Sequence, residues 1–251
     1  MTTLAVEEPL EIRLHGEPFV VTMRTPGDDM DLAAGLLVSE GAIWDRDHLP
    51  EMRYCTTVSG RSEQDYNTLS LTVSPDVPEP RSARATAMTS ACGVCGVDSI
   101  DEVRRATHFP LGPAEPLVTR EVLLSLPARL RRQQRVFDKT GGVHAAGLFA
   151  PDGHLLCLRE DVGRHNAVDK VVGWALREGR LPLLNTILQV SGRASFELVQ
   201  KASMAGIPAL SAVSAPSSLA VDLAVDSGVT LVGFSREDRA TVYAHPGRIH
   251  D

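Results

Sequence analysis

The feature that most constrains the fold is a regular alternation of short apolar runs and longer segments with helical periodicity after residue 140. The runs that predict strands are 143–149, 155–158, 186–190, 209–213 and 230–233. The segments that predict helices between them are 165–177, 195–205 and 218–226. Strands that alternate with amphipathic helices are typical of α/β layers around a mostly buried sheet. We therefore predict an α/β domain over residues 117–251.

The N-terminal part follows a different pattern. Alternating apolar residues in 10–14 and 19–23 flank Gly16 and predict a hairpin. Residues 28–40 carry apolar side chains at helical spacing, and Gly41 provides the expected stop. Further strands are expected at 54–58 and 69–73. These elements predict a small α+β lobe over residues 1–84.

Proline-bearing segments lie between the two parts. Residues 74–89 predict a linker or mobile loop, and 98–107 predict a helix. Residues 85–116 therefore form the predicted connection. Thr119 is expected to begin a helical region, with Pro127 starting a second segment that ends near Phe137.

Composition and charge exclude several classes of protein. The formal charge of the 251 residues is −7, and residues 1–50 carry all of it, with ten acids against three arginines. An acidic chain is a poor general binder of nucleic acid. No apolar run reaches the ~18–20 residues of a membrane-spanning helix, and the acidic first residues do not resemble a secretory signal. Four cysteines do not indicate a disulfide scaffold, so a reducing cytoplasm is expected.

One local cluster of positive charge stands out against this acidic balance. Five basic residues face only Asp138 within eleven positions: Arg129, Arg131, Arg132, Arg135 and Lys139. The cluster is consistent either with a solvated helix face or with the binding of an anionic small molecule.

The most reactive stretch is Cys92-Gly93-Val94-Cys95-Gly96. Two thiols at this spacing can chelate a metal, form a small disulfide ring, or share the activation of one thiolate. A zinc site needs two more ligands, and Cys55 and Cys157 are isolated, so we interpret both as packing residues. A thioredoxin-like motif needs a preceding strand, which the sequence does not favour here.

A second group of candidate residues follows the predicted strands. The segment 159–170 places polar side chains at a predicted strand-to-helix junction. This pattern is consistent with a ligand site or with an N-capped helix that carries surface ion pairs. Ser191-Gly192-Arg193 and the stretch from Ser214 to Ser218 also lie between strand and helix, where backbone N–H groups bind phosphates. His144 and His165 are consistent with cofactor orientation, proton transfer or a structural role.

Together these motifs resemble the formate dehydrogenase accessory sulfurtransferase family, the FdhD family. The resemblance covers nearly the whole chain. It is carried by Arg24-Thr25-Pro26-Gly27, Cys92-Gly93-Val94-Cys95-Gly96, residues 140–146, residues 160–170, Ser191-Gly192-Arg193, Gly206-Ile207-Pro208, residues 214–218 and Val232-Gly233-Phe234.

The resemblance implies a sulfur carrier that acts with two partner enzymes. A cysteine desulfurase would load a persulfide onto Cys92, with Cys95 as its partner thiol. The sulfur would pass to the molybdenum cofactor, bis-molybdopterin guanine dinucleotide, for formate dehydrogenase. The family's cofactor-binding stretch falls on Phe234, Ser235, Arg236, Glu237, Asp238 and Arg239. Two acids are unexpected beside the phosphates of a dinucleotide.

Further expectations follow from the same resemblance. It implies a homodimer, a mobile cysteine loop, and a larger domain similar to the cytidine deaminase fold, which would hold the cofactor. The ligand residues expected besides the 234–239 stretch are Ser191, Gly192, Arg193, Ser214, His144 and His165. Zinc deaminases use H-x-E, but Ala146 stands where the acid must be, so deamination is not expected. The alternative function is a zinc- or redox-responsive adaptor that uses the cysteine pair without sulfur transfer.

Overall fold

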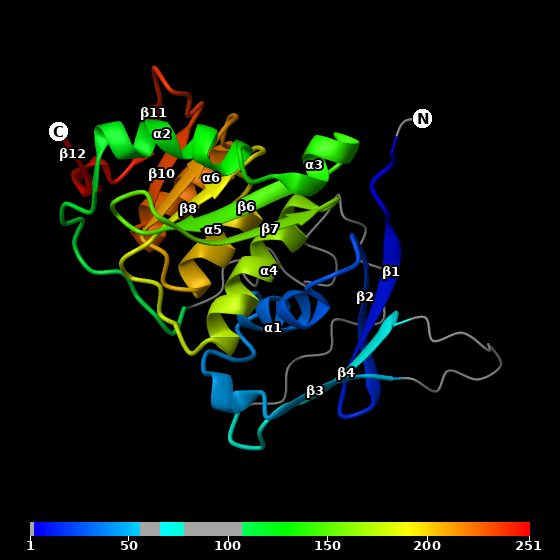
Figure 1. The fold of residues 1–251 in the computed structure, drawn as a ribbon. Helices are drawn as coiled ribbons and strands as arrows, with labels where there is room; N and C mark the ends of the chain where they lie inside the picture. The colour runs from blue at the N-terminus through cyan, green and yellow to red at the C-terminus, as the bar shows by residue number, and fades with distance from the viewer. Residues whose placement is uncertain (1–2, 56–65, 78–106) are drawn as a thin grey trace.

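The N-terminal part of the computed structural model is a four-stranded sheet with one helix. The structure describes residues 3–55, 66–77 and 107–251 (Figure 1). The sheet has the order β2-β1-β4-β3, in which β1 pairs antiparallel with β2 and parallel with β4. Its elements are β1 (Glu8–Leu14), β2 (Glu17–Arg24), α1 (Asp29–Ser39), the 3-10 turn η1 (Arg46–His48), β3 (Glu51–Tyr54) and β4 (Thr68–Thr72). The predicted hairpin and first helix are confirmed.

The C-terminal part contains a six-stranded mixed sheet of order β11-β10-β9-β8-β6-β7. Its strands are β6 (His144–Phe149), β7 (Leu155–Asp161), β8 (Ile187–Val190), β9 (Ala209–Ala212), β10 (Thr230–Gly233) and β11 (Thr241–Ala244). Strands β8, β9 and β10 are parallel, whereas β6, β7 and β11 each run antiparallel to their neighbours. The predicted α/β organisation, with an N-terminal sheet and a larger C-terminal sheet, is confirmed.

The helices cover both faces of this sheet. They are α2 (Arg120–Arg131), α3 (Arg135–Thr140), α4 (Arg164–Arg177), α5 (Phe196–Met204) and α6 (Ser218–Ser227). A short sheet pairs β5 (Val118–Thr119) with β12 (Ile249–His250), which follows the 3-10 turn η3 (Pro246–Arg248). Along β6, Ala145 and Phe149 pack with α2 on one face, while Ala146 and Leu148 join the core on the other. The period-2 alternation of a strand thus produces the layers seen in Figure 1.

The N-terminal part joins the C-terminal part through a close contact of α1 with α4. A Cβ added to Gly35 would lie 1.8 Å from the carbonyl oxygen of Asp169, and one added to Gly173 would lie 1.8 Å from that of Asp31. Only glycine permits such an approach of two backbones. The two sheets also share one hydrophobic core. The domain limits 1–84, 85–116 and 117–251 stay a prediction.

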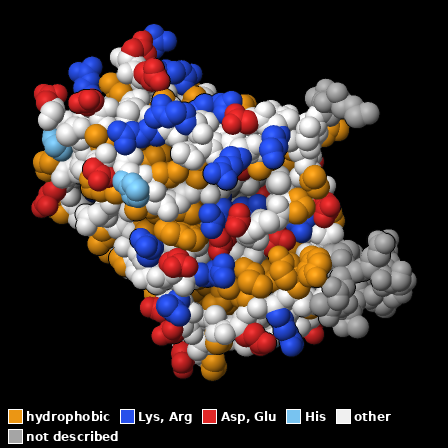
Figure 2. Space-filling model, in the orientation of Figure 1, with side chains coloured by type: hydrophobic (Ala, Val, Ile, Leu, Met, Phe, Trp, Pro, Cys, Tyr) orange, Lys and Arg blue, Asp and Glu red, His pale blue; other side chains and the backbone are white. Residues whose placement is uncertain are grey.

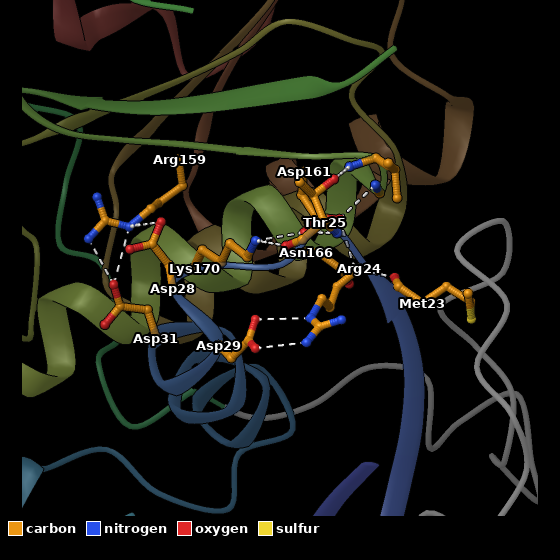
Figure 3. A network of polar contacts seen from close by, with 12 residues as sticks. Met23, Arg24, Thr25, Asp28, Asp29, Asp31, Arg159, Asp161, Asn166 and Lys170 are labelled. Carbon is orange, nitrogen blue, oxygen red and sulfur yellow. Dashed lines mark hydrogen bonds and ion pairs between the residues drawn. The ribbon is translucent and has the colours of Figure 1, made fainter. Parts of the chain in front are cut away.

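A buried polar network reinforces this joint (Figure 3). The Asp161 carboxylate accepts from the backbone N–H of Thr25 at 3.0 Å and from Lys170 Nζ at 2.8 Å. Lys170 also donates to the carbonyl of Thr25 at 2.8 Å, and Asn166 donates to that of Met23 at 2.8 Å. The side chains of Asp161, Asn166 and Lys170, which belong to the 159–170 motif, are each less than 10% exposed. They lie inside the molecule, so surface ion pairs are the wrong interpretation for them.

A second set of ion pairs lies on the α1 side of the same joint. Arg24 makes two parallel bonds of 3.0 Å to Asp29, which is the strong bidentate geometry. Asp31 accepts from Arg159 and Arg177, and Lys201 donates to both oxygens of Asp169 at 2.8 Å. Figure 3 shows Arg24 and Asp29 facing each other beside α1. The buried carboxylates of Asp29, Asp31 and Asp169 are thus each paired with a cation, and the joint therefore tolerates them.

Several boundaries differ from the predictions. Pro127 lies inside α2 and does not start a new segment; the helix ends at Arg131 instead. The burial of Leu126 and Leu130 against the sheet holds α2 together, since a proline removes only one donor. Strand β7 continues to Asp161 because it pairs with β6 as far as His144. Strand β3 lies at Glu51–Tyr54, earlier than predicted.

Candidate functional site

The loops that carry the predicted ligand residues meet at one edge of the six-stranded sheet. Strands β8, β9 and β10 are parallel, so the residues that follow them share this edge. Strand β6 is antiparallel to β8, so its first residue, His144, also lies there, opposite Asp161 of β7. Open α/β sheets bind ligands at the carboxyl ends of such strands.

Backbone hydrogen bonds hold these loops side by side. Ser214 N–H donates to the carbonyl of Gly192 at 3.2 Å, and Phe234 N–H donates to that of Ser214 at 3.2 Å. Ser191 exchanges two bonds with Ala145: its N–H donates at 3.0 Å, and its Oγ accepts at 2.9 Å. The loops after β8, β9 and β10 therefore form one continuous rim.

A pocket of about 690 Å³ opens at this rim. One wall comes from α2, α3 and the residues that join them to β6, and the other comes from the loop after β10. Its lining residues are Pro127, Ala128, Leu130, Arg131, Gln134, Phe137, Gly141, Gly142, Val143, His144, Ser191, Val213, Ser235, Arg236 and Glu237. This volume lies in the range of small-molecule sites.

Five of the predicted ligand residues line the pocket, namely His144, Ser191, Ser235, Arg236 and Glu237. The other predicted ligand residues are not among its described lining residues: Gly192, Arg193, Ser214, His165, Phe234, Asp238 and Arg239. Gly192 is nevertheless close, since a Cβ added there would lie 3.4 Å from His144 Nδ1. The predicted ligand residues are therefore divided between the pocket lining and the neighbouring parts of the rim.

His144 lines the pocket and has a perturbed pKa. Burial lowers its pKa below the usual 6.5, and the positive charges of Arg164, His165 and Arg193 lower it further. The imidazole is therefore neutral at pH 7 and can accept or donate one hydrogen bond. The same arginines give this end of the pocket a positive environment, which suits an anionic ligand.

His165 has a different role. Its Nε2 lies 3.2 Å from Ser195 Oγ and 3.3 Å from Glu197 Oε2. The hydrogen bond from His165 is the largest cause of a Glu197 pKa lowered to about 2. Because Ser195 and Glu197 contact the same nitrogen, the three do not form a Ser-His-acid relay, which needs both ring nitrogens. His165 holds the start of α5 in place.

The segment 234–239 forms a tight turn. Phe234 has a φ of 50° and is 44% exposed. Arg236 N–H donates to the carbonyl of Arg239 at 2.8 Å, and Arg236 Nη1 donates to the carbonyls of Ser235 and Val213. The guanidinium of Arg236 thus supports the loop that it belongs to.

Ser235 provides a polar group without a partner. It is 0% exposed, lines the pocket, and its Oγ has no hydrogen-bond partner among the described residues. The Nε of Arg164 is also buried and unpartnered within the described ranges. Buried polar atoms are normally satisfied, so these two are exceptions among the described residues.

The α2–α3 wall contains residues that the sequence did not reveal. Arg131, Gln134 and Phe137 line the pocket, and only Arg131 belonged to the basic cluster. The guanidinium of Arg131 lies 4.8 Å from the centre of the Phe137 ring and pairs with Asp138. On the face shown in Figure 2, Lys and Arg side chains gather over α2 and α3. No sequence signal marked Gln134 or Phe137, because their place depends on how α2 packs on the sheet.

The cysteine pair cannot be placed in this site, since Cys92 and Cys95 lie outside the described residues. Cys157 is buried, and burial raises the pKa of its thiol to about 12. It therefore stays protonated and serves as a packing residue, as predicted. Cys55 is a partly exposed free thiol. Within the described ranges, no group of three or more His, Cys, Asp or Glu residues could hold a metal ion.

The fold and site define a mixed-sheet α/β protein with a pocket at the carboxyl edge of its parallel strands. The model of the FdhD/NarQ family matches residues 5–250, and the chain belongs to this family. The match confirms the resemblance that the motifs indicated.

Known relatives extend this finding over the whole chain. The chain is 56% identical over 250 residues to the sulfur carrier protein FdhD of Streptomyces avermitilis, which covers 98% of the chain and 89% of the relative. It is 52% identical over 252 residues to the same-named protein of Mycobacterium tuberculosis, with 98% and 91% covered. A crystal structure described as a formate dehydrogenase accessory protein from Desulfotalea psychrophila matches with a TM-score of 0.76 and 28% identity, covering 99% and 91% of the two chains.

Proposed function

We propose that this protein is a sulfur carrier in the maturation of a formate dehydrogenase. The observation that carries the proposal is the 56% identity to a sulfur carrier protein FdhD over 98% of the chain. In this role Cys92 accepts persulfide sulfur from a cysteine desulfurase, and Cys95 assists. The sulfur then passes to bis-molybdopterin guanine dinucleotide, which is the substrate of the transfer and not a resident cofactor.

The chemistry of the pocket supports an anionic nucleotide ligand. Arg164 and Arg193 lie close enough to His144 to lower its pKa, and they make that end of the pocket positive. Positive side chains and rim backbone groups suit the phosphates of a guanine dinucleotide.

The transfer to Cys92 is a thiol–persulfide exchange. The Cys92 thiolate attacks the terminal sulfur of the desulfurase persulfide, an S–S bond forms on Cys92, and the desulfurase leaves as a thiolate. No oxidant or reductant is consumed in this exchange. Two glycines, Gly93 between the cysteines and Gly96 directly after Cys95, permit close approach of a partner backbone.

Several expectations belong to the same proposal. They are a homodimer, a cytoplasmic location, a C-terminal domain similar to the cytidine deaminase fold, a mobile cysteine loop, and no membrane or nucleic-acid partner. In the part of the chain that the structure describes, none of the helices combines the length and apolar character needed to span a bilayer.

Persulfide loading tests the proposal. The full chain and its single variants Cys92→Ala, Cys95→Ala and Cys55→Ala are incubated with a cysteine desulfurase and cysteine, and the added sulfur is located by mass spectrometry. We expect loading on Cys92, loss of loading in Cys92→Ala, and wild-type loading in Cys55→Ala. Equal loading of wild type and Cys92→Ala would contradict the assignment. One tightly held zinc ion per chain would instead support the adaptor alternative.

A further inference from the structure

The two acids in the middle of the 234–239 turn do not have equivalent positions. Glu237 lines the pocket, whereas Asp238 is not among the described lining residues. Both side chains are exposed, so exposure does not distinguish them, whereas their position relative to the pocket does. Only Glu237 can contact a ligand held in this pocket.

The Glu237 carboxylate is available to such a ligand. It forms no ion pair or side-chain hydrogen bond with any residue in the described ranges, although Arg131 and Arg236 line the same pocket. Those arginines are engaged elsewhere: Arg131 pairs with Asp138, and Arg236 donates to the carbonyls of Ser235 and Val213. The wall formed by the turn therefore presents an acceptor-only group to the pocket.

A free carboxylate repels phosphate, but it matches one edge of guanine. Guanine carries two adjacent donors, N1–H and the 2-amino group, which can bond the two oxygens of one carboxylate. Adenine has an acceptor at N1 and no 2-amino group, so the same carboxylate cannot bind it in this way. Hydrogen bonds to a charged acceptor are roughly twice as strong as neutral ones.

The opposite wall suits the flat surface of a base. Phe137 lines the pocket, and Arg131 lies over its ring at 4.8 Å. Aromatic rings and guanidinium planes are the groups on which nucleobases stack. Gln134 lines the pocket between them and is only 4% exposed. The positive end near His144 is left for the phosphates.

We propose that Glu237 selects guanine over other bases by accepting hydrogen bonds from its N1–H and 2-amino groups, while the Phe137 wall stacks the base. This inference rests on the proposed function, because it concerns how the same pocket recognises the nucleotide part of the substrate. It also explains why an acid stands in a stretch that binds a dinucleotide: this acid reads the base, away from the phosphates.

Calorimetric titration of the full chain with GDP, IDP and ADP tests the proposal. IDP keeps N1–H but lacks the 2-amino group, so it isolates one of the two contacts. We expect wild type to bind GDP about tenfold more tightly than IDP and still more tightly than ADP. Glu237→Gln should weaken GDP binding about tenfold and bring the GDP and IDP affinities within about threefold.

Asp222→Asn is the control, because it removes the same charge from an exposed position on α6 that belongs neither to the 234–239 stretch nor to the described lining residues. It should bind all three nucleotides within about twofold of wild type. Equal GDP affinity of Glu237→Gln and wild type would overturn the inference and leave the proposed function standing. A wild-type protein that binds no GDP would overturn both the inference and the nucleotide part of the proposed function. Thermal melting of each variant checks that it is folded.

Discussion

Replacement of Gly173 by alanine tests the α1–α4 joint, because two physical effects predict opposite results. Gly173 lies inside α4, where alanine is favoured over glycine by ~1 kcal/mol through helix propensity alone. The added Cβ, however, would lie 1.8 Å from the carbonyl oxygen of Asp31 and 2.6 Å from the backbone nitrogen of Gly35. Both atoms belong to the backbone of α1, so no side-chain rotation can relieve the clash.

The magnitude follows from the distance that the helices must move. Ordinary contacts of a Cβ begin near 3.4 Å, so α1 and α4 must separate by about 1.5 Å at this point. Overpacking of a tight core costs about 1–3 kcal/mol. Separation also lengthens the ion pairs that Asp31 makes with Arg159 and Arg177. After the gain in helix propensity is subtracted, we expect a net loss of about 2 kcal/mol in the free energy of unfolding.

Urea unfolding followed by circular dichroism measures this loss. With a slope of about 2–3 kcal/mol per molar urea, the midpoint should fall by roughly 1 M. Gly112→Ala is the control, since a Cβ added there meets nothing within 4 Å and the residue has no positive φ. A Gly173→Ala variant as stable as wild type would refute the account of the joint, because propensity would then outweigh packing.

Three further predictions concern the buried charges and the rim. Lys170→Met should lower the free energy of unfolding by about 3 kcal/mol or more, measured in urea, because it leaves the Asp161 carboxylate buried without its cation; a loss below about 1 kcal/mol would contradict this. The Glu197 pKa is about 2 in the folded state against an ordinary 4.5, so its stabilisation is present above pH 4.5 and is lost as pH falls toward 2. Melting temperatures of Glu197→Gln between pH 3 and 7 should lack this part of the acid dependence, and an unchanged profile would count against it. Gly192→Val should push the His144 ring and weaken GDP binding about tenfold, measured by calorimetry. Gly192→Ala should bind like wild type, because its added Cβ makes an ordinary contact of 3.4 Å. Equal GDP affinities of the two variants would show that the rim is not packed as described.

Local patterns in the sequence predicted most elements of the C-terminal sheet and its helices. Strands β8, β9 and β10 are fully buried, and their apolar runs end at glycine and serine junctions. Such bounded apolar runs allow these strands to be predicted from the sequence. Strand β11 was missed because Thr241 and Val242 are exposed on the edge of the sheet and show no apolar alternation. The extent of α2 past Pro127 depended on burial of its leucines against the sheet, which local rules do not contain.

In the candidate site, too, local sequence patterns did not predict the positions that depend on tertiary packing. The order of the strands brought His144, Ser191 and Ser235 to one edge. The junction after a predicted strand indicated Ser191, whereas Ser235 was expected only from the family resemblance. The role of Lys170 was not predictable, because its partners in the Thr25 region lie about 145 residues away in sequence. Phe137 was missed for the same reason: its place in the pocket comes from tertiary packing.

A crystal structure of the full chain with GDP bound is the most direct test of the central claim, that the pocket at the carboxyl edge of the sheet holds the guanine nucleotide part of the substrate. We predict electron density for the nucleotide between α3 and the 234–239 turn, with the base beside Phe137 and Glu237 and the phosphates toward Ser191 and His144. Ordered nucleotide density on any other surface, with this pocket filled only by water, would contradict the claim.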